Sequence, residues 1–128
     1  GKVLVSLRKL DRGRLVELGK RLISQGFEIV ATRTNQEILT KAGLECTMVN
    51  KVSEGSPHIV DAIKNDEISL IINSTEDSQG LEDARVIRCQ ALIHKVPCLT
   101  TVSAAFAMLD GLKTQDKLVV RSLQSIHN

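Results

Sequence analysis

Polar and basic side chains follow each of the five apolar runs that the sequence predicts as β-strands. Hydroxyl and amide groups donate hydrogen bonds to phosphate oxygens, arginine offers a planar fork of donors, and lysine adds a point charge. Ligands of parallel α/β sheets bind where the carboxyl ends of the strands meet, so the pattern predicts an anion site at that edge. In chain order the residues are Ser6, Arg8, Lys9, Arg12, Thr32, Arg33, Thr34, Asn35, Asn50, Lys51, Asn73, Ser74, Thr75, Thr100 and Thr101.

The same residue types also have a purely structural use. Ser, Thr and Asn at strand ends cap helices and stabilise turns, and the residues alone leave both interpretations open. The chain contains neither a GxGxxG nor a GxxxxGK[ST] motif, so a bound phosphate would sit on a threonine-rich turn and not on a glycine-rich loop. Thr32 and Lys51, at two of the strand ends, are expected to be surface groups.

Catalytic and metal-binding patterns are weak in this sequence. Asp83, beside Glu82 on a predicted helix, could act as a general base near an anion site, but no histidine follows a strand to assist it. A solvated or ion-paired Asp83 is therefore the favoured interpretation. The cysteines and histidines show neither a CxxC nor a paired ligand spacing, which predicts reduced thiols and no metal site; they are Cys46, Cys89, Cys98, His58, His94 and His127.

Length and composition restrict the class of protein. The chain has 128 residues, which suits one domain over residues 1–128, and its net charge of +2 with only two Phe argues against a nucleic-acid partner. No run approaches the ~20 apolar residues of a membrane span, and no signal peptide opens the sequence. We therefore expect a cytoplasmic location. The chain begins with Gly1 and enters a strand pattern at once, which predicts a domain of a longer polypeptide.

Short β-rich runs alternate with amphipathic helical ones along the whole chain. This order predicts an α/β fold, a three-layer sandwich in which a five-stranded parallel sheet carries helices on both faces. Asp11 is expected to cap the first helix, and Gly26, Gly43 and Gly111 are expected to end helices. The predicted strands are 3–7, 27–31, 45–49, 68–72 and 97–100, with a short terminal strand over 118–123 and a frayed tail over 124–128; the helices are 11–25, 35–42, 56–64, 79–94 and 104–109.

Four stretches resemble the C-terminal domain of carbamoyl phosphate synthetase large subunits, and the likeness extends over residues 1–112. The stretches are QGFEIVAT (25–32), VNKVSEGSPHI (49–59), IINST (71–75) and EDARVIR (82–88). The resemblance implies a methylglyoxal synthase-like fold and a regulatory role. It also implies nucleotide effectors, with UMP as inhibitor and IMP as activator in many bacterial forms, and ornithine bound at the border with the preceding synthetase half.

The resemblance also implies roles for individual residues. It places effector phosphate contacts at Ser6, Arg12, Thr32, Asn35, Lys51, Asn73 and Thr75, base and ribose contacts at Val52, Asp83 and Ile87, and an ornithine contact at Thr100. Two positions depart from the family pattern. Arg12 stands where the family often has Lys, and the turn over residues 32–35 reads TRTN where the family has T-x-G-T, which leaves the identity of the effector open.

The implied parent chain is an ATP-dependent, glutamine-using ligase of pyrimidine and arginine biosynthesis. Its implied cofactors are ATP with Mg or Mn, none of them bound by this domain, which is expected to be non-catalytic. The implied partners are nucleotide effectors, the preceding synthetase domains and the small glutaminase subunit, and an oligomer formed through this domain stays open. The alternative is a phosphate-handling lyase of the methylglyoxal synthase type, which is disfavoured because Arg8 stands where that enzyme has His. An inosinate cyclohydrolase relative is disfavoured by the 49–59 run.

Overall fold

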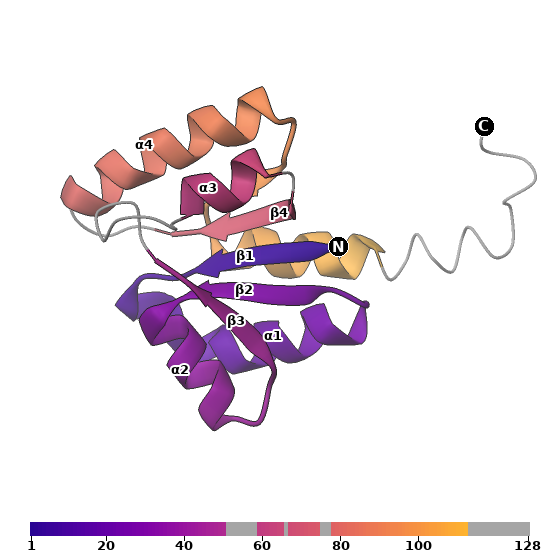
Figure 1. The fold of residues 1–128 in the computed structure, drawn as a ribbon. Helices are drawn as coiled ribbons and strands as arrows, with labels where there is room; N and C mark the ends of the chain where they lie inside the picture. Colours follow the sequence, from indigo (N-terminus) through magenta and orange to yellow (C-terminus); the bar gives the residue numbers. More distant parts are fainter. Residues whose placement is uncertain (51–58, 66, 75–77, 113–128) are drawn as a thin grey trace, which may run out of the picture.

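A computed structural model describes residues 1–50, 59–65, 67–74 and 78–112, with the backbone alone at 78–83. Strands and helices alternate along this part of the chain (Figure 1). The elements are β1 (Lys2–Ser6), the 3-10 helix η1 (Lys9–Arg14), α1 (Leu15–Ser24), β2 (Glu28–Thr32), α2 (Arg33–Lys41), β3 (Cys46–Val49), α3 (Ile59–Lys64), β4 (Ile68–Asn73), α4 (Ser78–Ile93) and β5 (Cys98–Leu99). A further helix occupies residues 102–112.

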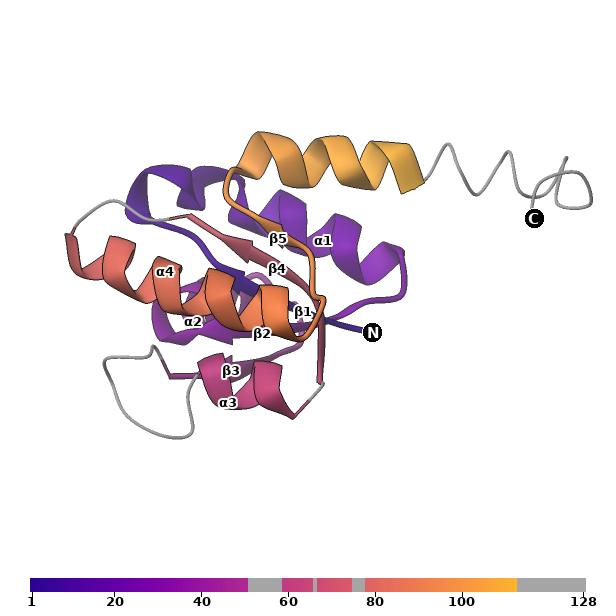
Figure 2. The same cartoon turned by 90° about the horizontal axis from the view of Figure 1, so that it is seen from above.

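The strands form one five-stranded sheet in the order β3-β2-β1-β4-β5, and every neighbouring pair is parallel. The sheet lies between two helical layers. Helix α1 and the 102–112 helix cover one face, and α3 and α4 cover the other (Figure 2). The predicted fold class, an α/β three-layer sandwich on a parallel sheet, is confirmed. Residues 113–128, with the predicted terminal strand and frayed tail, lie outside the described part.

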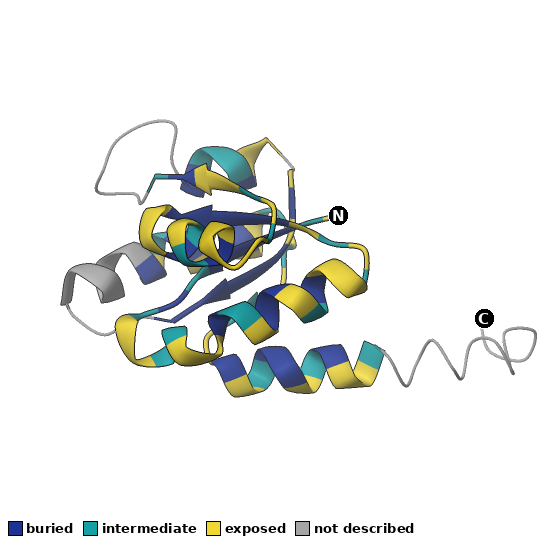
Figure 3. Cartoon of the chain, turned by 90° about the horizontal axis from the view of Figure 1, so that it is seen from below, coloured by how far each residue is buried: buried dark blue, intermediate teal, exposed yellow. Residues whose placement is uncertain are grey.

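Two aliphatic cores form because side chains alternate between the faces of each strand. Val3 and Val5 of β1 point into the larger core, where they meet Leu18 of α1, while Leu4 between them joins the second core. All four are at most 1 % exposed, and full burial of such a side chain contributes roughly 1.5–3 kcal/mol. The buried stripe of α1 and the exposed residues between its members are visible in Figure 3. The sheet is therefore a rigid base for the residues at its carboxyl edge.

The first helical segment differs from the prediction. In place of one helix over 11–25, the chain forms η1 over Lys9–Arg14 and only then α1. Asp11 does not cap an α-helix, so that prediction is wrong, because its carboxylate accepts a hydrogen bond from Arg8 Nε at 2.9 Å. Gly13 also lies in η1, where its low helix propensity disfavours a regular α-helical turn. The result is a tight turn that brings η1 back over the end of β1.

Helix ends agree with the sequence at some glycines and not at others. Gly26 and Gly43 adopt φ values of +91° and +86°, the left-handed conformation that ends a helix, as predicted. Gly111 was expected to end the last helix, but the chain stays helical through residue 112. Thr101 caps that helix, since its Oγ1 accepts a hydrogen bond from Ala104 N at 3.0 Å. Among the described residues, no helix is long and apolar enough to cross a membrane.

Candidate functional site

Three of the predicted phosphate contacts meet at the carboxyl edge of the central strands. Ser6 ends β1, Thr32 ends β2, and Asn35 lies in the first turn of α2. The Thr32 hydroxyl donates to Ser6 Oγ at 3.1 Å, and Asn35 Nδ2 donates to Thr32 Oγ1 at 3.1 Å. The structure therefore brings these three side chains together, but it joins them to one another in a hydrogen-bonded chain.

Asn35 also holds the backbone that leaves β1. Its Oδ1 accepts a hydrogen bond from Leu7 N at 3.1 Å, and its Nδ2 lies 3.4 Å from the Leu7 carbonyl oxygen. Asn35 is 2 % exposed and Thr32 is 1 % exposed. The expectation that Thr32 is a surface group is therefore wrong. The reason is that α2 begins directly at Arg33 and folds over the end of β2, which covers the Thr32 side chain.

The other predicted contacts are distributed differently. Arg12 lies on η1, half-buried, and its Nε donates to the Leu7 carbonyl at 3.2 Å. Ile87 is 1 % exposed and belongs to the core between α4 and the sheet. Its predicted contact with a base or ribose stays a prediction. Lys51, Val52 and Thr75 lie outside the described residues, as does the side chain of Asp83.

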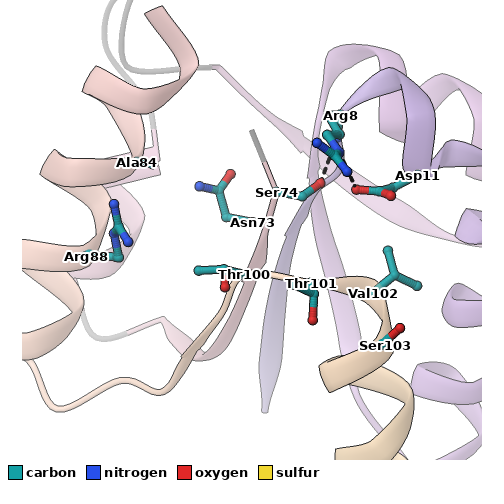
Figure 4. Close-up of a pocket in the computed structure, with 10 residues that line it drawn as sticks. All are labelled: Arg8, Asp11, Asn73, Ser74, Ala84, Arg88, Thr100, Thr101, Val102 and Ser103. Atoms are coloured by element: carbon teal, nitrogen blue, oxygen red, sulfur yellow. Dashed lines mark hydrogen bonds and ion pairs between the residues drawn. The ribbon is translucent and has the colours of Figure 1, made fainter. Parts of the chain in front are cut away.

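A cavity of about 430 Å³ opens beside this network, between the end of β4, helix α4 and the start of the 102–112 helix (Figure 4). It contains Asn73 from the predicted phosphate set and Thr100, the predicted ornithine contact. Two positions assigned to different ligands thus line one space. The full lining is Arg8, Asp11, Asn73, Ser74, Ala84, Arg88, Thr100, Thr101, Val102 and Ser103.

One wall of the cavity is built around Arg8. Its guanidinium Nε is bound to Asp11 at 2.9 Å, and its backbone N donates to Ser74 Oγ at 2.9 Å. The Ser74 backbone N in turn donates to the carbonyl of Ser6 at 3.0 Å. These contacts tie the start of η1 to the ends of β1 and β4. The Arg8 side chain is 38 % exposed, so it is held in place but still reaches solvent.

Positive charge also comes from the opposite wall and from the helix start. Arg88 is an exposed residue of α4, and among the described residues its guanidinium forms no ion pair. Burial raises the pKa of the nearby Cys98 thiol, and the charge of Arg88 opposes that increase. The 102–112 helix points its N-terminal end at the cavity, and a helix N-terminus carries about +0.5 of an elementary charge.

The sequence alone did not select Arg88 or Ser103 as site residues. A usable signal existed for Arg88, because Ala84 and Arg88 are four residues apart and share one face of α4. Ser103 lies two residues after Thr101, the residue that caps this helix, and so occupies its first turn. In the part of the chain that the structure describes, no group of three or more His, Cys, Asp or Glu side chains could hold a metal ion.

A five-stranded parallel sheet in this order, with a polar pocket at its carboxyl edge, defines a class of small α/β domains. The sequence model of the MGS-like domain matches residues 14–100, and the chain belongs to this family.

The curated relatives place this domain in a larger context. The chain is 45 % identical over 127 residues to the carbamoyl phosphate synthase large chain of Pseudomonas putida, covering 99 % of this chain and 12 % of that protein. The same protein of Xanthomonas axonopodis pv. citri is 44 % identical over 127 residues, with the same coverage. The chain thus spans about 12 % of the length of the relatives that it matches. The predicted resemblance to the MGS-like domain of these large chains is confirmed.

Solved structures agree on the fold. The crystal structure of methylglyoxal synthase from Elizabethkingia anophelis matches with a TM-score of 0.68, covering 84 % of this chain and 76 % of that one. The sequence identity is 13 %, so this likeness shows a shared fold and says nothing about shared chemistry.

Proposed function

We propose that this chain is the effector-binding regulatory domain of a carbamoyl phosphate synthase large chain and is not itself a catalyst. The observation that carries the proposal is the extent of the similarity, which covers 99 % of this chain but only 12 % of the relative. The matched part is therefore one small domain within a long synthase chain. The cavity at its strand ends, with two arginines and several hydroxyl groups, suits a small anionic effector.

The proposed effectors are nucleotides such as UMP and IMP, with ornithine near Thr100. The proposed partners are the preceding synthetase domains of the same chain and the small glutaminase subunit. In that assembly, ATP with Mg or Mn would be bound by other domains. An effector can shift the synthase only by the difference between its affinities for two states of the assembly, a coupling of typically about 1–3 kcal/mol.

A non-catalytic role is consistent with the lining of the cavity. Among the described residues, the cavity contains one carboxylate, Asp11, and no histidine. The Asp11 carboxylate is ion-paired with Arg8 at 2.9 Å, which disfavours its use as a general base. Incubation of the chain with dihydroxyacetone phosphate should therefore give no methylglyoxal above the uncatalysed rate. Clear turnover would contradict this part of the proposal.

Thermal denaturation with and without UMP, IMP and ornithine tests the effector-binding role. A ligand that binds only the folded chain stabilises it by about 2.7 kcal/mol when present at 100 times its Kd. For a domain of this size, that corresponds to an increase in Tm of about 10 °C. If none of the three ligands raised the Tm at millimolar concentration, the effector-binding role would be refuted.

A further inference from the structure

Two large apolar side chains stand next to each other on the surface at the C-terminal end of α4. Leu92 is 81 % exposed and Ile93 is 67 % exposed, and Pro97, which follows the helix, is exposed as well. We call these three residues the α4 end patch. The only comparably exposed large apolar residue among those described, Leu10 of η1, lies between two charged residues. Single exposed apolar residues are ordinary on a protein surface, whereas grouped ones mark an interaction surface.

The two hydrophobic cores do not include the α4 end patch. Helix α4 packs on the sheet through Ile87 and Ala91, which are both buried. Leu92 and Ile93 follow Ala91 by about 100° and 200° around the helix, so both point away from that contact. The exposed residue Cys89 lies three and four positions before them and therefore shares their face of the helix. The outer face of α4 thus ends in an apolar surface that the fold itself leaves uncovered.

A tight turn holds the end of α4, so the patch is presented from a fixed backbone. Lys95 adopts a φ of +59°, the left-handed conformation that glycine usually provides after a helix. Val96 N donates a hydrogen bond to the Ala91 carbonyl at 2.7 Å. Lys95 N donates to the Leu92 carbonyl at 3.2 Å. A surface whose backbone is already ordered loses little conformational entropy on binding, and the turn therefore favours docking of a partner on the patch.

The α4 end patch and the first residue of the chain lie at the same end of the molecule. Figures 1 and 2 both show the C-terminal end of α4 and the N-terminus on the side where the strands begin. Gly1 is held there, since its carbonyl accepts a hydrogen bond from Glu28 N at 3.0 Å. The chain spans about 12 % of the length of its curated relatives, so most of such a large chain lies outside this domain. Polypeptide that enters at Gly1 therefore reaches the fold on the side of the patch.

The surroundings of the patch indicate the chemistry of a partner surface. Arg85, one turn before Cys89 on α4, is exposed, and Lys95 is exposed in the turn after the helix. Neither side chain forms an ion pair with a described residue. An apolar centre with charged groups around it is the usual arrangement of a contact between proteins or domains. A matching surface would present apolar side chains with carboxylates beside them.

We propose that the α4 end patch docks this domain onto the preceding synthetase domain of the same large chain. The proposal rests on the proposed function, which makes this chain one domain of that large chain. The partner surface receives Leu92 and Ile93 at its apolar centre and places carboxylates opposite Arg85 and Lys95. Because the contact lies on the side where the strands begin, it leaves the cavity at their carboxyl ends accessible.

Alkylation of Cys89 by iodoacetamide, followed by mass spectrometry, measures whether the outer face of α4 is covered. We expect Cys89 to react at least about tenfold more slowly in the purified full-length large chain than in the 128-residue chain, because it reacts only when the contact opens. Leu92→Gln combined with Ile93→Gln in the large chain should restore the rate to within about threefold of the 128-residue chain, since the central apolar contacts are lost.

The matched control is Leu10→Gln in the large chain, because Leu10 is 77 % exposed but lies on η1. It should leave the alkylation rate of Cys89 unchanged. Glutamine is a good helix former and the replaced side chains are exposed, so the double variant should fold. Circular dichroism of the 128-residue chain and of the large chain would verify this.

Three results would overturn docking through the patch. The first is equal alkylation of Cys89 in the large chain and in the 128-residue chain, and the second is protection that survives the double substitution. The third is protection by a different partner. Protection already present in the 128-residue chain would indicate its own residues 113–128, protection that grows with protein concentration would indicate a second copy, and protection that needs the small glutaminase subunit would indicate that subunit.

Failure of docking and failure of the effector role give different results. If UMP or IMP raised the Tm while Cys89 of the large chain stayed fully reactive, the effector role would stand and docking through the patch would fail. If Cys89 were protected in the large chain and no effector raised the Tm, docking would stand and the effector role would fail.

Discussion

Replacement of Asn35 by Ala separates a structural role from a ligand-binding role for this residue. The resemblance to carbamoyl phosphate synthetases implies that position 35 contacts an effector phosphate. The structure gives it three internal contacts, to Leu7 N, to the Leu7 carbonyl and to Thr32 Oγ1, at 3.1, 3.4 and 3.1 Å. A residue used mainly for ligand binding would be dispensable for folding, whereas a residue that holds β1 and β2 together would not.

The expected loss follows from the groups that would lack partners. Asn35→Ala leaves the Leu7 N–H without its acceptor, and Leu7 is 2 % exposed, so water cannot easily replace it. An unsatisfied buried donor costs about 1–3 kcal/mol, and the Thr32 hydroxyl oxygen loses a donor as well. Together these changes should lower the free energy of unfolding by about 2–4 kcal/mol. For a domain of this size the Tm should fall by about 10 °C.

Urea denaturation followed by circular dichroism measures this loss directly. The matched control is Glu37→Ala, because Glu37 is an exposed residue of the same helix and the substitution should change stability by less than about 0.5 kcal/mol. The urea midpoint of Asn35→Ala should be clearly lower, with an unchanged slope. If Asn35→Ala and Glu37→Ala were equally stable, the hydrogen-bonded chain at this sheet edge would not have the structural role argued above.

Two further substitutions or titrations test the packing and the thiols. Gly19→Ala would place a Cβ 2.7 Å from Leu39 Cδ2 in the core, so it should lower the free energy of unfolding measured in urea by about 1–3 kcal/mol. The control is Gly13→Ala, whose added Cβ would have no atom within 4 Å and which should be neutral or slightly stabilising. Cys98 should react with iodoacetamide more slowly than the exposed Cys89, because burial raises the pKa of the Cys98 thiol. Because the pKa of Cys98 is raised in the folded chain, its contribution to the stability of the folded state is fully present below the ordinary thiol pKa. That contribution is lost as the pH rises through the folded-state pKa. Equal alkylation rates of Cys98 and Cys89 would contradict this account.

The sheet and its helices could be predicted from the sequence because local patterns determine them. The aliphatic runs of β1 and β4 have apolar residues on both faces, as a covered parallel sheet requires, and each was located to within one residue. Gly26 and Gly43 marked two helix ends because a left-handed residue is needed there. Gly111 did not mark the end of a helix, because glycine can also adopt the helical conformation and the helix continues through residue 112.

The site was harder to predict, since it depends on the direction of individual side chains. The sequence located Thr32 and Asn35 at a strand end, but it could not reveal that α2 starts at Arg33 and buries both. The 3-10 turn of η1 includes a local contact between Arg8 and Asp11 at 2.9 Å, which the helical spacing of the apolar residues did not reveal. Arg88 enters the cavity from a helix that follows β4, so its role emerges only when α4 is placed beside β5 and the 102–112 helix.

The central position of β1 has a consequence for how the chain folds. β1 pairs with β2 on one side and with β4 on the other, while β2 pairs only with β3 beyond it and β4 only with β5. Without β1 the sheet would separate into two two-stranded ribbons that share no hydrogen bonds, and such ribbons are marginally stable in water. Because β4 is distant in sequence from β1, the sheet can close only after a long stretch of chain is available. β1 precedes the other four strands of this sheet in the chain but is among the last of them to complete its pairing.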